Sequence, residues 1–259
     1  MKISSSKNIK DLLLRDLKKY AEPIFAKFTR KILNICKDRY AQDDILLGVR
    51  VTKQRSLAKK YVNMLNFKET EKLLQDKIHE LRFIALVILS KEYKRAGNKL
   101  KSKIARIYLR NYKYINNWDL VDTSAPNILG HYWYNNELDK FWEFAKSGSL
   151  WKERIAMIST FYFIRQNRFN ETLKLAEVFL NHKHDLMHKA SGWMLREIGK
   201  RDKKALLSFL DKYASIMPRT MLRYSIEKLT NQQKKFYLKE SSSNSPRQMK
   251  LERVHFENG

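Results

Sequence analysis

Apolar residues recur at spacings of three and four along most of the chain, which is the period of one face of an α-helix. Ile155, Ile158 and Tyr162 form one such stripe. No stretch alternates apolar and polar residues in the two-residue period of a half-buried strand. The pattern therefore predicts an all-α protein.

The boundaries of the predicted helices follow from proline and glycine. Pro23 and Pro218 fall at first helical positions, where the missing N–H has no cost. Gly199 follows an apolar run and is a plausible helix end. Pro126 lies within a longer apolar block, where it should break or kink the helix. The predicted helices cover about 7–20, 23–41, 54–65, 67–75, 78–95, 98–113, 116–134, 137–147, 149–166, 170–181, 184–198, 202–214, 218–229 and 231–238.

A repeat is visible in the polar residues near the start of alternate helices. The comparable positions are separated by 37, 35, 35 and 34 residues, and they are Arg82, Asp119, Arg154, Lys189 and Arg223. Helix pairs of this period are typical of HEAT-like repeats. We expect such repeats to stack into a curved right-handed superhelix, an α-solenoid, over residues 1–238 as one domain. Residues 239–259 are polar and weakly patterned, which predicts a disordered C-terminal tail.

The charge of the chain indicates a polyanionic partner. Its 53 Lys and Arg residues against 27 Asp and Glu give a net charge of +26, and nucleic acid explains such an excess better than an anionic membrane surface. Equivalent repeat positions lie in a row, and four of the five above are basic. This predicts a basic concave face that binds a duplex, although a solvated face with random charges is the alternative. Asp119 interrupts the row and needs an explanation.

The remaining features favour a cytoplasmic protein. Cys36 is the only cysteine, so neither an intramolecular disulfide nor a cysteine zinc site can form. The N-terminal residues lack the apolar core of a signal peptide. The longest apolar run, Phe83–Leu89, is too short to span a bilayer. We expect a cytoplasmic protein without a membrane partner, associated with the nucleoid through DNA.

The segment Asn116–Asp122 carries the first candidate chemistry. Asn116 is a good helix N-cap, and a carboxylate at Asp119 favours the helix N-terminus. Trp118 and Asp122 are four residues apart and share one helical face. They are either an aromatic–carboxylate pair on a binding surface or a core tryptophan beside a surface aspartate.

A second candidate is Gly192, followed by Trp193. Glycine within a helix costs roughly 1 kcal/mol relative to alanine, so something must approach the backbone there. A neighbouring helix and a ligand are both possible, and Trp193 could line a ligand surface. The cluster of His182, His184 and His188 could bind zinc, but no HExxH pattern or carboxylate ligand accompanies it. We expect no metal and, without a phosphate-cradling or dinucleotide glycine loop, no cofactor.

Five runs, in order, carry a resemblance to a known family. They are His79–Arg82, Asn117–Pro126, Trp151–Ala156, Gly192–Glu197 and Met217–Tyr224. Together they resemble the AlkD-type DNA alkylation repair glycosylases, and the likeness extends from about Gly48 to Tyr237.

The resemblance implies a function and a set of residues. The family is built of HEAT-like repeats that wrap duplex DNA, and it excises N3- and N7-alkylated purines. Its two tryptophans, aspartate and arginine match Trp118, Trp193, Asp122 and Arg154 of this chain. We therefore expect Asp122, Trp118 and Trp193 to be catalytic. Arg154 should grip a phosphate of the DNA backbone, and the row adds Lys189, Arg223 and Arg82 as further DNA contacts.

The expected activity is hydrolysis of the N-glycosidic bond by a monomer, without a Schiff-base lysine and hence without strand cleavage. The partner is double-stranded DNA that contains alkylated bases. A non-catalytic HEAT scaffold that binds RNA, DNA junctions or acidic proteins fits the charge and the repeats equally well. A metallohydrolase that uses the histidine cluster is a third reading, and it would lose activity with chelators.

Overall fold

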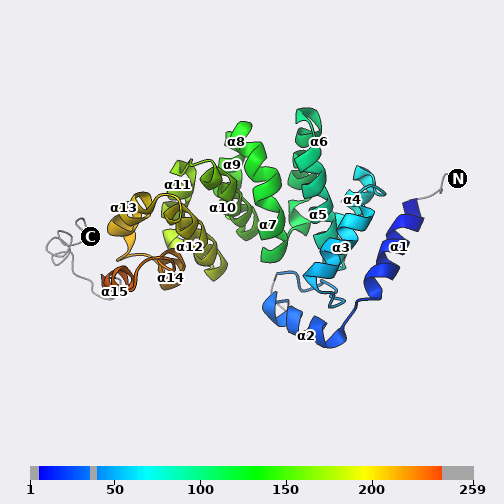
Figure 1. Ribbon diagram of the computed structural model, residues 1–259, viewed down its shortest axis with the longest axis horizontal. Helices are drawn as coiled ribbons and strands as arrows, with labels where there is room; N and C mark the ends of the chain where they lie inside the picture. The colour runs from blue at the N-terminus through cyan, green and yellow to red at the C-terminus, as the bar shows by residue number, and fades with distance from the viewer. Residues whose placement is uncertain (1–5, 36–39, 241–259) are drawn as a thin grey trace. The chain divides into compact units, whose positions relative to one another are not determined.

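The computed structural model describes residues 6–35 and 40–240, and nearly all of them are helical or lie in short connections between helices (Figure 1). Within these ranges there is no strand, and a single parallel bridge joins Ile45 and Ile78. The all-α class predicted from the apolar spacing is confirmed. Superhelical curvature and a basic concave face stay predictions.

The chain divides into two compact units, of which the first ends at Gln166 and the second begins at Asn167. The α-helices of the first unit are α1 (Ser6–Lys18), α2 (Pro23–Ile32), α3 (Val51–Tyr61), α4 (Phe67–Leu74), α5 (His79–Arg95), α6 (Asn98–Arg110), α7 (Trp118–Ala125), α8 (His131–Asn135), α9 (Leu138–Ala145) and α10 (Leu150–Arg165). Those of the second unit are α11 (Asn170–Val178), α12 (Asp185–Gly199), α13 (Lys203–Tyr213), α14 (Arg219–Ser225) and α15 (Asn231–Glu240). Short helical turns, η1 (Tyr112–Tyr114), η2 (Pro126–Gly130) and η3 (Phe179–Asn181), connect some of them.

Most predicted helices are present with boundaries shifted by a few residues, and the prolines act as expected. Pro23 begins α2, and Pro218 lies one residue before α14. Pro126 breaks the predicted helix over 116–134 into α7, a π-helical turn and α8. The helix predicted over 23–41 ends at Ile32, because Asn34 adopts a positive φ of 54°. Residues 36–39 of that prediction lie outside the described residues.

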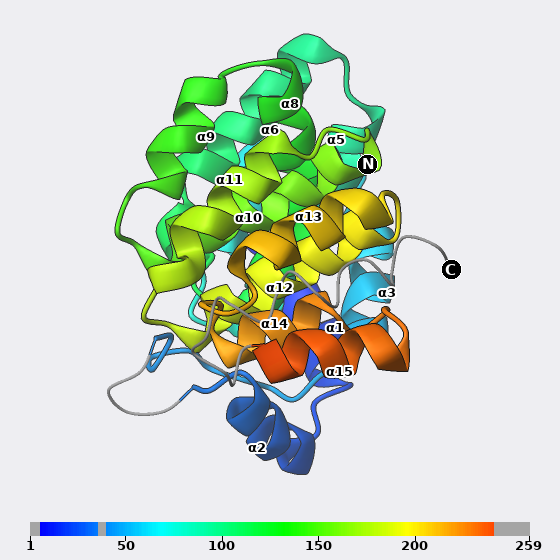
Figure 2. The same cartoon turned by 90° about the vertical axis from the view of Figure 1, so that its left-hand side faces the viewer.

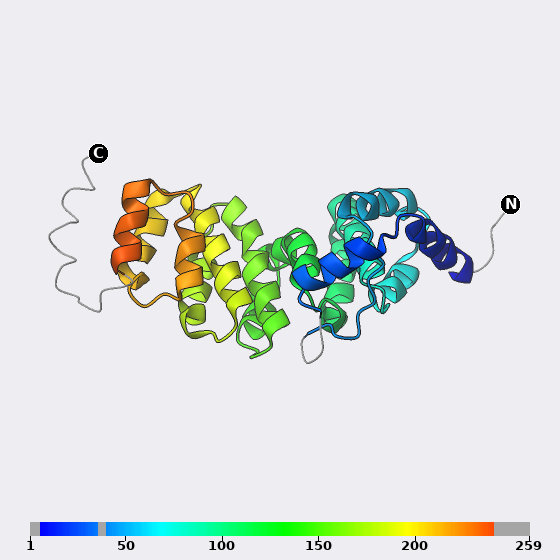
Figure 3. The same cartoon turned by 90° about the horizontal axis from the view of Figure 1, so that it is seen from below.

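The first unit is built around α5, which is buried along most of its length, from His79 to Leu89. It packs against α3, α4 and α7, and α7 in turn packs against α10. These neighbours can be followed in cyan and green in Figures 1 and 3. Helices α5, α7 and α10 are therefore successive neighbours. The repeat seen in the sequence corresponds to the first turns of these neighbouring helices.

The second unit is organised by α12, which packs against α11, α13 and most extensively α14 (Figure 2). Gly192 explains how close α12 and α14 come. A Cβ added at Gly192 would lie 2.4 Å from the carbonyl oxygen of Met221 and 2.6 Å from the Cβ of Tyr224. The close approach that the sequence left open is therefore that of a neighbouring helix.

The first unit contains the same device. A Cβ added at Gly130 would lie 2.5 Å from the carbonyl oxygen of Ser159 and 2.7 Å from the Cβ of Tyr162. In both units a glycine thus meets the backbone of the helix that begins one repeat later. The recurrence is independent structural support for the period near 35.

Two further predictions concern the ends of the chain and membranes. Helix α15 extends to Glu240, two residues beyond the predicted domain end at 238, and the rest of the predicted tail lies outside the described residues. That residues 1–238 form a single domain stays a prediction. Among the described residues, no helix has the length and apolar character needed to cross a membrane.

The Gly192 contact generates a test of the packing. We expect Gly192→Ala to lower the free energy of unfolding by about 1–2 kcal/mol. A Cβ at 2.4 Å from a backbone oxygen places the overpacking cost in the upper part of the roughly 1–3 kcal/mol range, above the roughly 1 kcal/mol gained from helix propensity. Gly97→Ala is the matched control, since a Cβ there meets nothing within 4 Å. Denaturant unfolding of both variants measures the difference. A Gly192→Ala protein as stable as wild type would contradict the contact.

Candidate functional site

Asp122 and Arg154 form a two-pronged ion pair between α7 and α10. Arg154 Nε donates to Asp122 Oδ1 at 3.1 Å, and Nη2 donates to Oδ2 at 2.9 Å. The arginine side chain is 5% exposed and the aspartate 18% exposed. Planar bidentate pairing fixes the plane of the carboxylate as well as its position. One edge of the Asp122 carboxylate is thus held by Arg154, while part of the group remains open to solvent.

Burial raises the pKa of Asp122 above its ordinary value. The charge and hydrogen bonds of Arg154 act in the opposite direction, and the negative charge of Asp119 raises the pKa further. A carboxylate that is poorly hydrated holds its charge in a less screened environment, where it interacts more strongly with a developing cation. This environment suits electrostatic catalysis.

Helix α7 presents Trp118 one turn before Asp122, and both side chains are half-buried. The N-cap of this helix lies one residue later than the predicted Asn116. Its N-cap is Asn117, whose side-chain oxygen accepts a hydrogen bond from the backbone N–H of Trp118 at 2.8 Å. The amide nitrogen of the fully buried Asn117 donates to the carbonyl of Leu33 at 3.0 Å. The start of the helix is therefore tied to a segment 84 residues away in sequence.

A buried charge network explains why Asp119 interrupts the basic row. The Nε2 atom of His79 lies 2.8 Å from Asp119 Oδ2, and Nδ1 lies 3.1 Å from Asp44 Oδ2. Arg82 also bonds to the carboxylate of Asp44. Asp119 is thus the partner of a buried histidine on α5, and the pair connects α5 to the first turn of α7.

His79 carries a proton at neutral pH because of these two carboxylates. Burial alone lowers the pKa of an imidazole, but the charge and hydrogen bond of Asp119 and the hydrogen bond of Asp44 raise it to about 9. The charge of Arg82 opposes them. The imidazolium therefore donates from both nitrogens, and it bridges the two acids as a fixed cation.

The segment before α3 is held by a second buried acid. The Oε1 atom of Glu80 accepts hydrogen bonds from the backbone N–H groups of Leu47, Gly48 and Val49 at 3.0, 2.8 and 3.3 Å. Together with the Asp44 pairs, these bonds fix residues 44–49 against the start of α5. The sequence run His79–Arg82, which carried part of the resemblance, is a structural clamp.

Two arginines predicted to contact DNA have intramolecular partners. Arg82 is 4% exposed and is occupied by Asp44, so the structure favours a structural role over the predicted DNA contact. Arg154 is occupied by Asp122, and its geometry supports orientation of that carboxylate rather than a grip on phosphate. Within the first unit, the row members Arg82, Asp119 and Arg154 thus all take part in ion pairs.

The other predicted residues belong to the second unit. The indole N–H of Trp193 donates to Glu197 Oε1 at 3.1 Å, which fixes a half-buried ring on α12. Lys189 pairs with Asp185 at 2.8 Å, one turn away on the same helix. Arg223, on α14, is exposed. A surface pair such as that of Lys189 is weak, so it can exchange its partner for an anion.

The histidine cluster is used to begin α12. His182 Nδ1 accepts from the backbone of His184 at 2.9 Å, and His184 Nδ1 accepts from the backbone of Leu186 at 3.1 Å. His188 Nε2 donates to the carbonyl of His182 at 2.6 Å. No group of three or more potential metal ligands is present in the described part of the chain. Hydrogen bonding at the start of α12 is a sufficient structural role for the three histidines.

Sequence reasoning missed His79 and Asp44. Their sequence signal is weak, because a histidine at the start of an apolar helix is ordinary and Asp44 stands in a connecting segment. Only the unexplained acid at Asp119 pointed to a missing cation. Its partner is 40 residues away in sequence, beyond the reach of helical spacing.

The network predicts a pH dependence of stability. The folded-state pKa of His79, about 9, lies above the ordinary 6.5. The protonated imidazole therefore stabilises the fold fully below about pH 6.5, and this contribution is lost as the pH rises through about 9. We expect the free energy of unfolding to fall over that range, and His79→Gln to be less stable with a flatter profile.

NMR titration of the wild type supplies an internal control. The imidazole of His131, whose pKa burial and the charge of Lys101 lower, should titrate below 6.5, whereas that of His79 should titrate near 9. A His79 midpoint at or below 6.5 would show that the two carboxylates do not hold its proton.

Comparison with known proteins agrees with this fold and sequence. The family model described as DNA alkylation repair enzyme matches residues 13–229. A solved structure described as a predicted DNA alkylation repair enzyme from Enterococcus faecalis is similar with a TM-score of 0.64 and 13% identity. The similarity covers 82% of this chain and 97% of that one, and at this identity it shows the fold alone. No curated protein matches the chain. The family match spans most of the sequence, and the chain therefore belongs to the DNA alkylation repair enzyme family.

Proposed function

We propose that this protein is a DNA glycosylase that hydrolyses the N-glycosidic bond of cationic N3- and N7-alkylated purines in double-stranded DNA. The observation that carries the proposal is Asp122, a half-buried carboxylate held on one side by Arg154 and placed one turn from Trp118. Membership of the DNA alkylation repair enzyme family supports DNA as the substrate.

The chemistry of the substrate explains why a single carboxylate is sufficient. An N3- or N7-alkylated purine already carries a positive charge, so it leaves as a neutral base with the electron pair of the glycosidic bond and needs no general acid. The sugar becomes oxocarbenium-like as the bond breaks. The carboxylate of Asp122 stabilises this charge and accepts the proton of the water that attacks C1′.

The neighbouring residues have distinct proposed roles. Arg154 orients Asp122 and keeps it ionised despite its burial. The aromatic face of Trp118 lies against the sugar, where a contact between a cation and a ring is worth about 0.5–2 kcal/mol. Trp193 offers the substrate a second ring from the second unit. Lys189 and Arg223 contribute to the binding of the DNA backbone. The product is an abasic site in an uncut strand, because no lysine is assigned as a Schiff-base nucleophile.

The competing function is that of a non-catalytic scaffold for nucleic acid. A scaffold benefits from a net charge of +26 as much as an enzyme does. It does not need a half-buried carboxylate with a raised pKa beside a tryptophan. Such perturbed groups concentrate at catalytic sites, which favours the glycosylase.

Replacement of Asp122 tests the proposal directly. We expect wild type to release N7-methylguanine and N3-methyladenine from methylated duplex DNA, and Asp122→Asn to lose several hundred-fold or more of the single-turnover rate, because about 4 kcal/mol of electrostatic stabilisation is removed. Duplex binding should remain within severalfold of wild type. Asp139→Asn, the same change at an exposed position of the first unit, is the control. Tight binding with no base release by any of the proteins would favour the scaffold.

The environment of Asp122 predicts the pH dependence of the reaction. Because only the carboxylate is active, the rate should fall as the pH drops through the pKa of Asp122, which lies above the ordinary 3.8. Arg154 lowers that pKa, so Arg154→Gln should move this acid limb to higher pH and reduce the maximal rate. Single-turnover rates, corrected for spontaneous release, give both quantities. If the variant lost affinity for DNA but kept the limb of wild type, Arg154 would be a phosphate contact instead.

A further inference from the structure

A basic pocket of about 400 Å³ lies in the first unit, beside the Asp122–Arg154 pair but outside it. Helices α3, α5, α6, α7, α8 and α10 and the turn between α7 and α8 form its walls. Thr123, the residue after Asp122, lines it, whereas neither Asp122 nor Trp118 does. The same helices that hold the candidate reaction site in their first turns thus enclose the pocket with their later turns.

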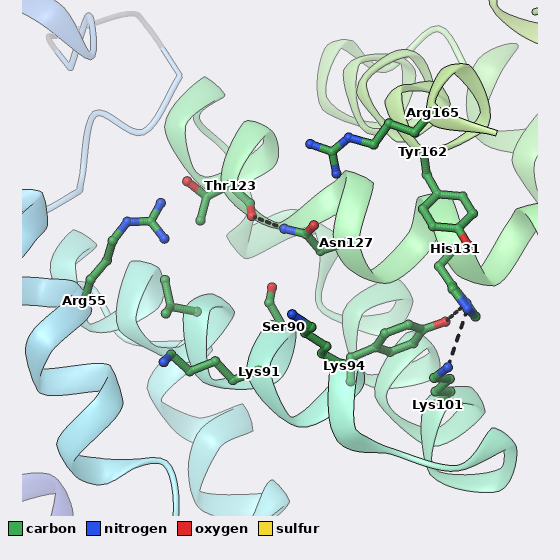
Figure 4. Close-up of a pocket in the computed structure, with 12 residues that line it drawn as sticks. Arg55, Ser90, Lys91, Lys94, Lys101, Thr123, Asn127, His131, Tyr162 and Arg165 are labelled. Atoms are coloured by element: carbon green, nitrogen blue, oxygen red, sulfur yellow. Dashed lines mark hydrogen bonds between the residues drawn. The ribbon is translucent and has the colours of Figure 1, made fainter. Parts of the chain in front are cut away.

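The charge of the pocket has one sign. Five of its lining residues are cationic, and none of the lining residues in the described part of the chain is acidic. The cations are Arg55, Lys91, Lys94, Lys101 and Arg165. Figure 4 shows Arg55 and Arg165 reaching toward the space from opposite sides. Mutual repulsion of these groups is a cost unless an anion occupies the space between them.

Three of the cations have no carboxylate partner. Within the described ranges, Arg55, Lys91 and Lys94 form no ion pair, in contrast to Arg82 and Arg154. Arg55 instead lies over the ring of Phe83, at 5.4 Å from its centroid. Unpaired cations at a concave surface are the electrostatic signature of phosphate binding.

The neutral groups of the pocket also point to an anion. The hydroxyl oxygen of Ser90 is buried and has no hydrogen-bond partner in the described structure, and Figure 4 shows it directed into the space. A buried hydroxyl without a partner is costly, and a phosphate oxygen would satisfy it. His131 contacts Tyr93 at 3.0 Å and Lys101 at 3.5 Å. These contacts hold the ammonium group of Lys101 at the wall.

We propose that this pocket is a phosphate-binding subsite that holds a backbone phosphodiester of the DNA. The source of the phosphate rests on the proposed function. Arg154 and Arg165 are eleven residues apart on α10, which is about 16 Å along the helix at 1.5 Å per residue. The pocket extends from Thr123, next to Asp122, to Arg165 at the end of α10, so a phosphate held there lies outside the glycosidic bond that reacts.

The first experiment compares two pairs of charge-neutralising substitutions in full-length protein. Lys91→Gln with Lys94→Gln removes two pocket cations. Lys59→Gln with Lys68→Gln removes two exposed cations of the first unit that do not line the pocket. Binding to undamaged duplex is measured over a range of salt concentrations, and thermal unfolding shows that each protein is folded. Undamaged DNA makes the result independent of base release.

We expect the pocket pair to weaken binding about tenfold or more at low salt and to lower the slope of log affinity against log salt by about 0.9, as for one lost phosphate contact. The control pair should change both quantities much less. Equal effects of the two pairs would overturn the subsite as a DNA contact.

A second experiment locates the phosphate. Duplexes with one neutral methylphosphonate at successive positions on either strand around a fixed lesion should bind wild type more weakly at the one position whose phosphate enters the pocket. The pocket pair should be insensitive at that position only. A uniform response at every position would contradict the assignment.

A third arm tests the other source of phosphate. Titration of inorganic phosphate without DNA, followed by NMR of the tyrosine rings of the pocket, reports binding of a free phosphate. Saturable binding that the pocket pair loses, combined with unchanged duplex binding, would assign the pocket to a free phosphate ester and overturn the DNA source.

The two proposals can fail separately. Loss of duplex affinity in the pocket pair supports the subsite even if wild type releases no base. Release of bases by wild type, with pocket and control pairs equal in binding, supports the glycosylase and overturns the subsite.

Discussion

The requirement that every buried charge has a partner determines how the first unit is assembled. Asp119 pairs with His79 across α5 and α7, and Asp122 pairs with Arg154 across α7 and α10. Removal of one partner of a buried pair typically costs about 3–5 kcal/mol. Three successive helices are therefore held in one register by ion pairs near their first turns, and α7, which carries Trp118, is held on both sides. The candidate reaction site is a consequence of this register.

In the second unit, neighbouring helices are joined by an ion pair and also by close approach of their backbones. Arg196 on α12 bonds to Glu227, just beyond α14, and Gly192 removes the side chain that would separate the two helices. Gly130 does the same between the turn after α7 and α10. Close backbone approach and inter-helix ion pairs together set the spacing of neighbouring helices, so a tryptophan such as Trp193 is displayed by a rigid layer.

Helix positions could be predicted from the sequence because they depend on local spacing and on proline. The break at Pro126 needed only the missing N–H and the ring. The N-cap was placed at Asn116 rather than Asn117, because the choice is made by the bond from Asn117 to Leu33, which no local pattern reveals. The end of α2 at Ile32 was missed for the same reason, since the positive φ of Asn34 has no strong sequence signal.

The candidate site was predictable in its residues but not in their pairing. Repeat counting identified Arg82, Asp119 and Arg154 as equivalent, but it treated each as an independent charge. Their partners are 32 to 40 residues away, so the sequence alone could not show which cations are neutralised. The low helix propensity of Gly192 is visible in the sequence. The reason for a glycine at this position, the backbone of Met221, lies in another helix and is not.

The cations near Asp122 and those that line the pocket differ in their surroundings. Next to Asp122, Arg154 is paired with the carboxylate, so in the proposed reaction it orients that group and adds little net positive charge where the oxocarbenium-like sugar would form. A free arginine there would repel the transition state. Toward the ends of α5 and α10, cations are ordinary because they favour the helix dipole, which is why Lys94 and Arg165 attracted no notice in the sequence. In three dimensions they line one pocket, and none of its lining residues in the described part of the chain is acidic. In the two proposals taken together, the pocket attracts the polyanion at a place separate from the carboxylate, so that binding and chemistry do not weaken each other.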